Sequence, residues 1–184
     1  MNINEIQNNM AVFIDTQIQG ILQHKPENRQ FLEYHDLQRL STAVEGIWIK
    51  HCGETPAEIK SALIMSQAVM AGDLATKITL IKHLLSGAGL ITGLGIILGG
   101  VGTILGWGAG IITTIITAIN GVALAGPLAL IALGAAASLI AGYMMFSNMP
   151  EEELSRKAVQ ILKQGVNDAL PHVWKSYAAK WKNA

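Results

Sequence analysis

The most constraining feature of the sequence is a stretch of 67 residues, 84–150, that contains no Asp, Glu, Lys, Arg or His. Fourteen of the 19 glycines of the chain lie in it. A membrane span needs only about 20 predominantly apolar residues at a rise of about 1.5 Å per residue. The stretch therefore has room for two spans or for three short ones, and it is too long for one buried helix. We expect a hydrophobic helical hairpin that enters a lipid bilayer.

Turn-forming residues divide this stretch at Gly99-Gly100, at Asn120-Gly121 and at Gly126-Pro127. The best-formed segments are 101–119 and 122–146, and with 19 and 25 residues each is long enough to cross roughly 30 Å of hydrocarbon. Residues 84–98 form an approach helix, part of one longer helix, or a third element. A hairpin brings the chain back to the side from which it came, so both polar arms are expected on one side.

Small residues recur at a spacing of four within the stretch: Gly102, Gly106 and Gly110 on the first segment, and Gly134, Ser138 and Gly142 on the second. Residues four apart share one helix face, and a ridge of small residues lets two helices approach closely. Either the two hairpin helices pack on each other, or the ridges also assemble copies of the protein. Leucine at Gly106 or Gly110 is expected to disturb function more than leucine at Gly165, outside the hairpin.

A polar stripe accompanies the first ridge. Thr113, Thr117 and Asn120 lie at i, i+4 and i+7 and therefore share one helix face. Thr103 is a further hydroxyl on the same segment, about three turns before Thr114. In an assembly of several helices these side chains would line an aqueous path. In the alternative interpretation, the threonine hydroxyls bond to carbonyls of their own helix.

Composition limits the remaining possibilities. The formal net charge is zero, so the chain lacks the excess of positive charge that attracts nucleic acid. Only 14% of its residues are charged, against about 25% in typical soluble domains. Cys52 is the sole cysteine, which excludes an intramolecular disulfide. The first residues lack the basic region and apolar core of a secretory signal. We expect synthesis in the cytosol without a cleaved signal peptide, followed by secretion or delivery to a target membrane.

The hydrophobic hairpin, taken as 87–147, is flanked by arms 1–86 and 148–184 with the periodicity of amphipathic helices. Helices are predicted over 2–24, over 28–50, and from Thr55-Pro56-Ala57-Glu58, where Thr55 caps the helix and Glu58 completes a capping box. Another helix begins at about Pro150, and Pro171 separates a last segment. The fold class is therefore all-α, with amphipathic helices around the glycine-rich hairpin.

The last segment carries Trp174, Tyr177 and Trp181 on one face, with lysines among them. Trp and Tyr beside Lys are typical of a membrane–water interface. The alternative is a C-terminal helix that docks its aromatic side chains in the protein core.

The sequence shows little catalytic chemistry. Glu33, His35 and Asp36 are near neighbours, but their spacing on a helix does not form a metal triad. His51 and Cys52 are adjacent and would point in different directions. The glycine-rich stretch is followed by no Lys-Ser or Lys-Thr pair of a phosphate loop. We expect no enzyme, no metal and no cofactor.

Polar helices around a charge-free, Gly/Ala-rich hairpin resemble the pore-forming domains of colicins. The repeats of Gly102, Gly106 and Gly110 and of Gly134, Ser138 and Gly142 are also similar to the glycine-zipper pore-forming effectors of the bacterial type VI secretion system. The resemblance covers 87–147 by character. It implies an antibacterial toxin that inserts the hairpin, oligomerises and depolarises the target by ion leak, with a delivery, chaperone or immunity protein as partner. A resident membrane-anchored scaffold and a carrier of an apolar ligand are the alternatives.

Overall fold

The computed structural model describes residues 2–72, 76 and 149–182. Its elements are α1 (Ile3–Leu22), a 3₁₀ turn η1 (Glu27–Arg29), α2 (Tyr34–Cys52), α3 (Ala57–Met70) and α8 (Glu151–Lys182). The described residues contain helices and no strand, which confirms the predicted all-α class for this part of the chain. The glycine-rich hairpin lies outside the described residues.

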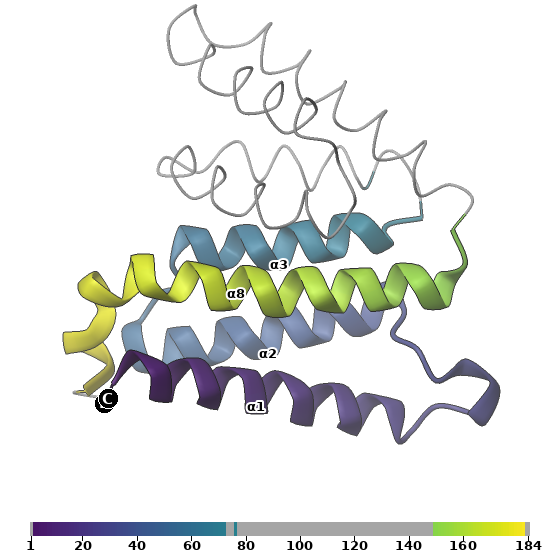
Figure 1. Ribbon diagram of the computed structural model, residues 1–184, viewed down its shortest axis with the longest axis horizontal. Helices are drawn as coiled ribbons and strands as arrows, with labels where there is room; N and C mark the ends of the chain where they lie inside the picture. Colours follow the sequence, from purple (N-terminus) through teal and green to yellow (C-terminus); the bar gives the residue numbers. More distant parts are fainter. Residues whose placement is uncertain (1, 73–75, 77–148, 183–184) are drawn as a thin grey trace, which may run out of the picture.

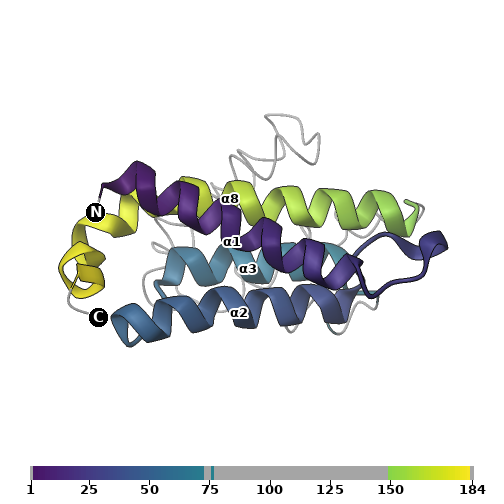
Figure 2. The same cartoon turned by 90° about the horizontal axis from the view of Figure 1, so that it is seen from below.

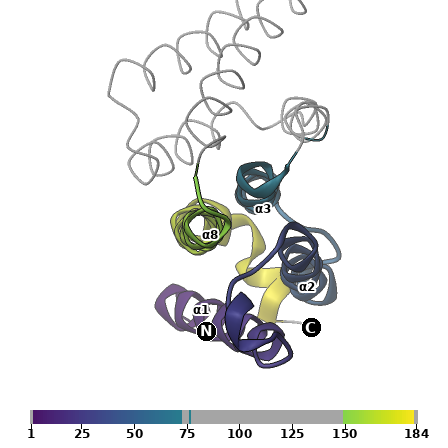
Figure 3. The ribbon, with the colours of Figure 1, turned by 90° about the vertical axis from the view of Figure 1, so that its right-hand side faces the viewer.

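The described helices form an up-and-down bundle in which each helix runs antiparallel to the one before it (Figure 1). The view from below shows the same alternation of direction (Figure 2). Seen end-on, α1 lies beside α2 and α8, and α3 lies beside α2 and α8 on the other side (Figure 3). Because the directions alternate, α3 ends and α8 begins at the same end of the bundle.

The core consists of apolar residues at helical spacing on all four helices. On α1 the buried residues are Ile6, Met10, Ile14 and Ile18, one on each successive turn. The other helices contribute buried Leu37, Leu40, Val44 and Trp48 from α2, Ile59 and Leu63 from α3, and Ile161, Leu162, Val166 and Leu170 from α8. Apolar residues at this spacing form a stripe along one face of each helix, and that face is buried in the core.

Helices α3 and α8 approach each other closely at Gly165. A Cβ atom built on Gly165 would lie 2.7 Å from Cβ of Ala62, so glycine at this position is a packing requirement. Ala62 on α3 and Ala158 and Ala169 on α8 are small and buried. Gly165 is therefore not a neutral reference for substitutions in the hairpin. Gly46, which has open space around it, is the suitable one.

Three predicted helix boundaries differ from the structure. Residues 28–33 do not belong to α2, which begins at Tyr34 after a cap in which Glu33 and Asp36 bond to each other's backbone N–H. Thr55 does not cap α3: Pro56 is the N-cap residue, and the buried Thr55 hydroxyl lies 3.5 Å from the carbonyl oxygen of Glu45. At α2 a local capping box three residues long sets the start, whereas at Thr55 a bond to the carbonyl of Glu45 takes the place of the expected cap.

The third difference is at Pro171, where α8 continues instead of ending. A proline lacks the N–H that would bond to the carbonyl four residues earlier, here that of Asn167. The Gln7 side chain of α1 donates a hydrogen bond to that carbonyl oxygen at 3.2 Å. The free acceptor is thus satisfied from another helix, and the last turns of α8 bend from its axis (Figure 1).

Candidate functional site

The residues predicted to form the ridges and the pore lie outside the described residues. These are Gly102, Gly106, Gly110, Gly134, Ser138 and Gly142 for packing, and Thr103, Thr113, Thr117 and Asn120 for the lining. Their roles stay predictions. What the structure describes is the bundle from which the charge-free stretch departs and to which it returns.

The end of α3, which precedes that stretch, and the start of α8, which follows it, lie at one end of the bundle (Figures 1 and 3). The chain leaves α3 through Ala71 and Gly72, and it re-enters through Met149 and Pro150. The carbonyl of Pro150 accepts the first backbone bonds of α8, from Glu153 and Leu154, at 3.0 Å each. Glu151, Glu152 and Glu153 occupy the first turn, where negative charge is favoured by the helix dipole. The Pro150 carbonyl and the three glutamates together favour a helix start at Glu151.

A network of charged groups lies at the same end, in the connection between α1 and α2. Lys25 Nζ is 2.7 Å from Asp36 Oδ2 and 3.7 Å from Glu33 Oε2. Asp36 is 2% exposed, and its Oδ2 also accepts the backbone N–H of Glu33 at 2.9 Å. The backbone N–H of Leu32 donates to the buried Ser155 hydroxyl of α8 at 2.9 Å. The connection is therefore tied to the first turns of α8.

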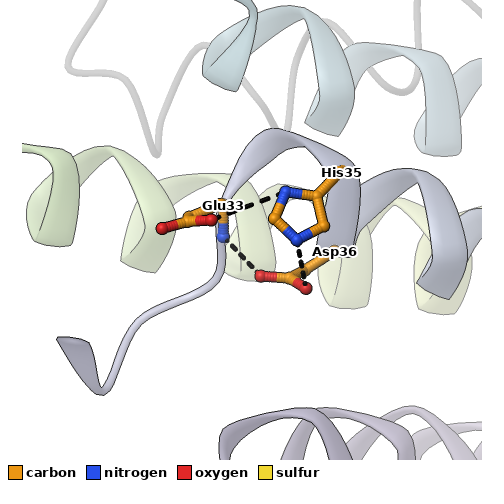
Figure 4. A group of neighbouring side chains, drawn as sticks. All are labelled: Glu33, His35 and Asp36. Carbon is orange, nitrogen blue, oxygen red and sulfur yellow. Dashed lines mark hydrogen bonds and ion pairs between the residues drawn. The ribbon is translucent and has the colours of Figure 1, made fainter. Parts of the chain in front are cut away.

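Glu33, His35 and Asp36 converge in space (Figure 4), with potential ligand atoms within 4.8 Å of one another. The sequence analysis placed all three residues on a helix, whereas Glu33 is the N-cap residue with extended backbone and its side chain turns back toward Asp36. The three side chains therefore lie closer together than helical spacing implies. Lys25 already supplies a positive charge to the buried carboxylate of Asp36. The arrangement has the chemistry of a structural ion pair, and we assign no metal to it.

The pKa of Asp36 is held below its ordinary value of 3.8. Burial by itself would raise this pKa. The hydrogen bond from Lys25, the bond from the backbone N–H of Glu33 and the positive charges of Lys25 and His35 lower it by more than burial raises it. A carboxyl whose pKa is lower in the folded than in the unfolded protein stabilises the fold above the unfolded pKa. This stabilisation is lost as the pH falls through the folded pKa.

We expect Asp36→Asn to lower the free energy of unfolding by about 3 kcal/mol at neutral pH, because the change leaves Lys25 beside a neutral partner in a buried position. The difference from wild type is expected to be constant down to about pH 4 and to shrink below it. Urea unfolding between pH 3 and 7 measures both effects.

The control is Asp15→Asn, which removes an ion pair with Lys163 between exposed side chains and is expected to cost about 0.5 kcal/mol or less. An Asp36→Asn protein as stable as the Asp15→Asn protein at pH 7 would contradict the assigned role of the Lys25–Asp36 pair.

Aromatic side chains gather at the opposite end of the bundle, where the bent part of α8 meets the end of α2. Trp48 is fully buried and makes edge contacts with Tyr177 and Trp181, at ring-centroid distances of 5.9 and 4.9 Å. The rings of His51 and Trp181 stack at 4.6 Å, and Trp174 contacts Trp181 at 6.1 Å. We call Trp48, His51, Trp174, Tyr177 and Trp181 the aromatic cluster.

The carboxylate of Glu54 lies beside the aromatic cluster and bonds to two residues of α8. Glu54 accepts a hydrogen bond from Lys180 at 2.9 Å and one from the Tyr177 hydroxyl at 3.3 Å. The bond from Lys180 lowers the pKa of Glu54, and the same bond raises the pKa of Lys180. Burial, together with the nearby charge of Glu54, raises the pKa of Tyr177. These bonds hold the end of α8 against the end of α2.

Trp174, Tyr177 and Trp181 thus pack against the bundle in this structure, as in the docking alternative, and each stays partly exposed. Their predicted role at a membrane interface stays a prediction. Sequence reasoning grouped these three residues correctly on one face but missed Trp48 and His51 as their partners. The only signal in the sequence for these partners was that aromatic residues lie near the end of α2 as well as near the end of α8.

Among the described helices, none combines the length and the apolar character that a membrane span requires. The comparisons with known proteins give no relative: no family model matches the chain, and no curated protein or solved structure matches it.

Proposed function

We propose that the protein is a pore-forming antibacterial toxin that inserts the charge-free stretch into a target membrane and depolarises it by ion leak. The observation that carries the proposal is the 67-residue stretch without a charge. It is supported by the described bundle, in which the helix before the stretch, α3, ends at the same end where the helix after it, α8, begins. A bundle with this connectivity stays on one side of a bilayer while the stretch crosses and returns.

The driving force is hydrophobic transfer. Each apolar side chain moved from water to lipid contributes roughly 1.5–3 kcal/mol, and a span holds about 20 predominantly apolar residues. In water the bundle or a delivery, chaperone or immunity protein shields the stretch. In the membrane the ridges of small residues pack, and copies of the chain assemble around a path.

The pore is expected to be small. The stretch carries no charged side chain, so no ring of carboxylates or guanidiniums selects strongly by sign. A lining of Thr113, Thr117, Asn120 and glycine carbonyls presents oxygen atoms, which suit small monovalent cations. Planar-bilayer conductance in potassium chloride gradients is expected to show weak cation preference. Liposomes that hold a dye larger than hydrated ions are expected to retain it.

Four outcomes would contradict parts of this proposal. Strong anion selectivity, or rapid loss of the large dye, would contradict the proposed lining. Absence of conductance from a protein that fractionates stably with the membranes of its own host would favour the alternative of a resident scaffold anchor. Absence of both conductance and membrane association would favour a carrier of an apolar ligand. Comparing the toxicity of the protein after cytosolic and after periplasmic expression tests independently from which side of the membrane the protein acts.

A further inference from the structure

The last turns of α8 form an arm that follows a proline. We call residues 172–182 the arm. Pro171 has no N–H to donate to the carbonyl of Asn167, and that carbonyl oxygen is bonded by Gln7 of α1 instead. The arm bends from the axis of the helix at this point (Figure 1). Because one backbone bond is already missing there, the arm can move relative to the long part of α8 without breaking it.

The polar interactions that hold the arm meet at one side chain. Among the described residues, the hydrogen bonds and the ion pair from side chains of the arm to the bundle all go to Glu54, which accepts from Tyr177 and Lys180. The side chains of Lys180 and Glu54 are 50% and 59% exposed. An ion pair at this exposure contributes little stability, because water competes for both charges. The docked arm therefore depends mainly on its aromatic contacts.

These aromatic contacts leave two buried nitrogen atoms without a partner. Trp48 and His51 of α2 both contact Trp181 of the arm. The Nε1 atom of Trp48 and the Nδ1 atom of His51 are buried and make no hydrogen bond in the structure. A buried polar atom without a partner costs free energy, which exposure to water recovers. Movement of the arm away from α2 would therefore relieve this cost while it breaks the ring contacts.

The composition of the arm is complementary to an anionic membrane surface. Residues 172–182 contain three lysines and no acidic residue. Lys175 is exposed, and it has no hydrogen-bond or ion-pair partner among the described residues. Anionic lipids attract lysines, and the headgroup level of a bilayer favours Trp and Tyr. Trp174, Tyr177 and Trp181 are only half-buried against the bundle, so part of each ring remains for a membrane surface to cover.

We propose that the arm is a hinged membrane-binding element that turns at Pro171. In water it is docked on α2 through the aromatic cluster, and Glu54 is the latch of the docked form. At a bilayer that contains anionic lipid, the arm leaves α2 and places Trp174, Tyr177 and Trp181 at the headgroup level. The proposal rests on the proposed function only in that the protein meets a membrane.

Distances between two spin labels test the movement. In the full-length protein with Cys52→Ala, labels at Thr42→Cys on α2 and Ser176→Cys on the arm occupy exposed positions. Vesicles of equal parts phosphatidylcholine and phosphatidylglycerol are expected to lengthen and broaden this distance, and vesicles of phosphatidylcholine alone are not. The control pair, Thr42→Cys and Gln160→Cys, places the second label on α8 before Pro171 and is expected to keep its distance. No change in the first pair, or an equal change in both pairs, would overturn the proposal.

Two lysine variants that keep Cys52 test the contact by flotation with the same mixed vesicles. Lys175→Gln is expected to raise the vesicle concentration for half-binding about fivefold, because it removes one lysine from the anionic surface. Lys60→Gln removes the same charge from an exposed position on α3 and is expected to change it little. Equal effects of the two variants would contradict binding through the arm.

Two glutamate variants test the latch in the same assay. Glu54→Gln weakens the docked form and is expected to lower the vesicle concentration for half-binding at least about twofold. Glu58→Gln, in the first turn of α3, removes the same charge from a residue that makes no hydrogen bond or ion pair with the described part of the arm, and is expected to have a smaller effect. If Glu54→Gln lowers the melting temperature without improving vesicle binding, Glu54 is only a structural contact and the proposal fails.

Conductance separates the arm from the pore. A first label pair that lengthens on the mixed vesicles, in a protein that gives no conductance, would support the hinged arm and contradict the proposed function. Conductance from a protein in which that pair keeps its distance would support the proposed function and overturn the hinged arm.

Discussion

Leucine in place of Gly106 or Gly110 is expected to abolish the bilayer conductance, with a loss of at least about a hundredfold at equal membrane-bound protein. The reason is that two helix backbones approach closely only where no side chain separates them. Leucine adds a bulky side chain to each contact, and in a symmetric assembly the clash repeats at every interface. Single-channel recordings, with liposome flotation to show equal binding, measure the effect.

The matched control is Gly46→Leu. Gly46 lies on the exposed face of α2 and has open space around it, so leucine there changes hydrophobicity without a clash. Gly165→Leu is unsuitable, since Gly165 touches Ala62 and its loss would disrupt the bundle itself. If the Gly106→Leu and Gly110→Leu proteins conduct as wild type does, the ridge is not an assembly surface.

Trp48→Ala is expected to lower the free energy of unfolding by about 3–5 kcal/mol, because it empties the site of a large, fully buried side chain. Trp48 is 0% exposed and contacts both Tyr177 and Trp181. Its removal should therefore also free the bent end of α8. Urea unfolding measures the loss. Hydrogen exchange at residues 172–182 is expected to accelerate more than exchange at the junction end of α8.

Trp48→Phe separates packing from hydrogen bonding. The Nε1 atom of Trp48 is buried without a hydrogen-bond partner in the structure, so replacing Trp48 by Phe removes no hydrogen bond. The smaller aromatic ring keeps part of the packing against Tyr177 and Trp181. A loss clearly smaller than that of Trp48→Ala is expected. If the two variants lose equal stability, or if Trp48→Ala unfolds like wild type, the aromatic cluster does not hold α8 in place.

The helices of the two arms were predictable because their apolar residues are spaced at about one helical turn within each segment. Ile6, Met10, Ile14 and Ile18 show this on α1, and all four are buried as their spacing indicates. Local chemistry also set the end of α2, where Gly53 takes a left-handed conformation with φ of 78°. The charge-free stretch is likewise a property of the sequence alone, and the proposed function depends on it.

The tertiary structure decided what depends on residues far apart in the chain. Helix α8 continues through Pro171, and the Asn167 carbonyl that the proline leaves free accepts a hydrogen bond from Gln7, 160 residues away along the sequence. The residues just before α2 are held in place from far along the chain, because the backbone N–H of Leu32 donates to the Ser155 hydroxyl of α8. Likewise, α3 shows from its own sequence which side is apolar, but the contact of its Ala62 with Gly165 of α8 depends on how the rest of the chain folds.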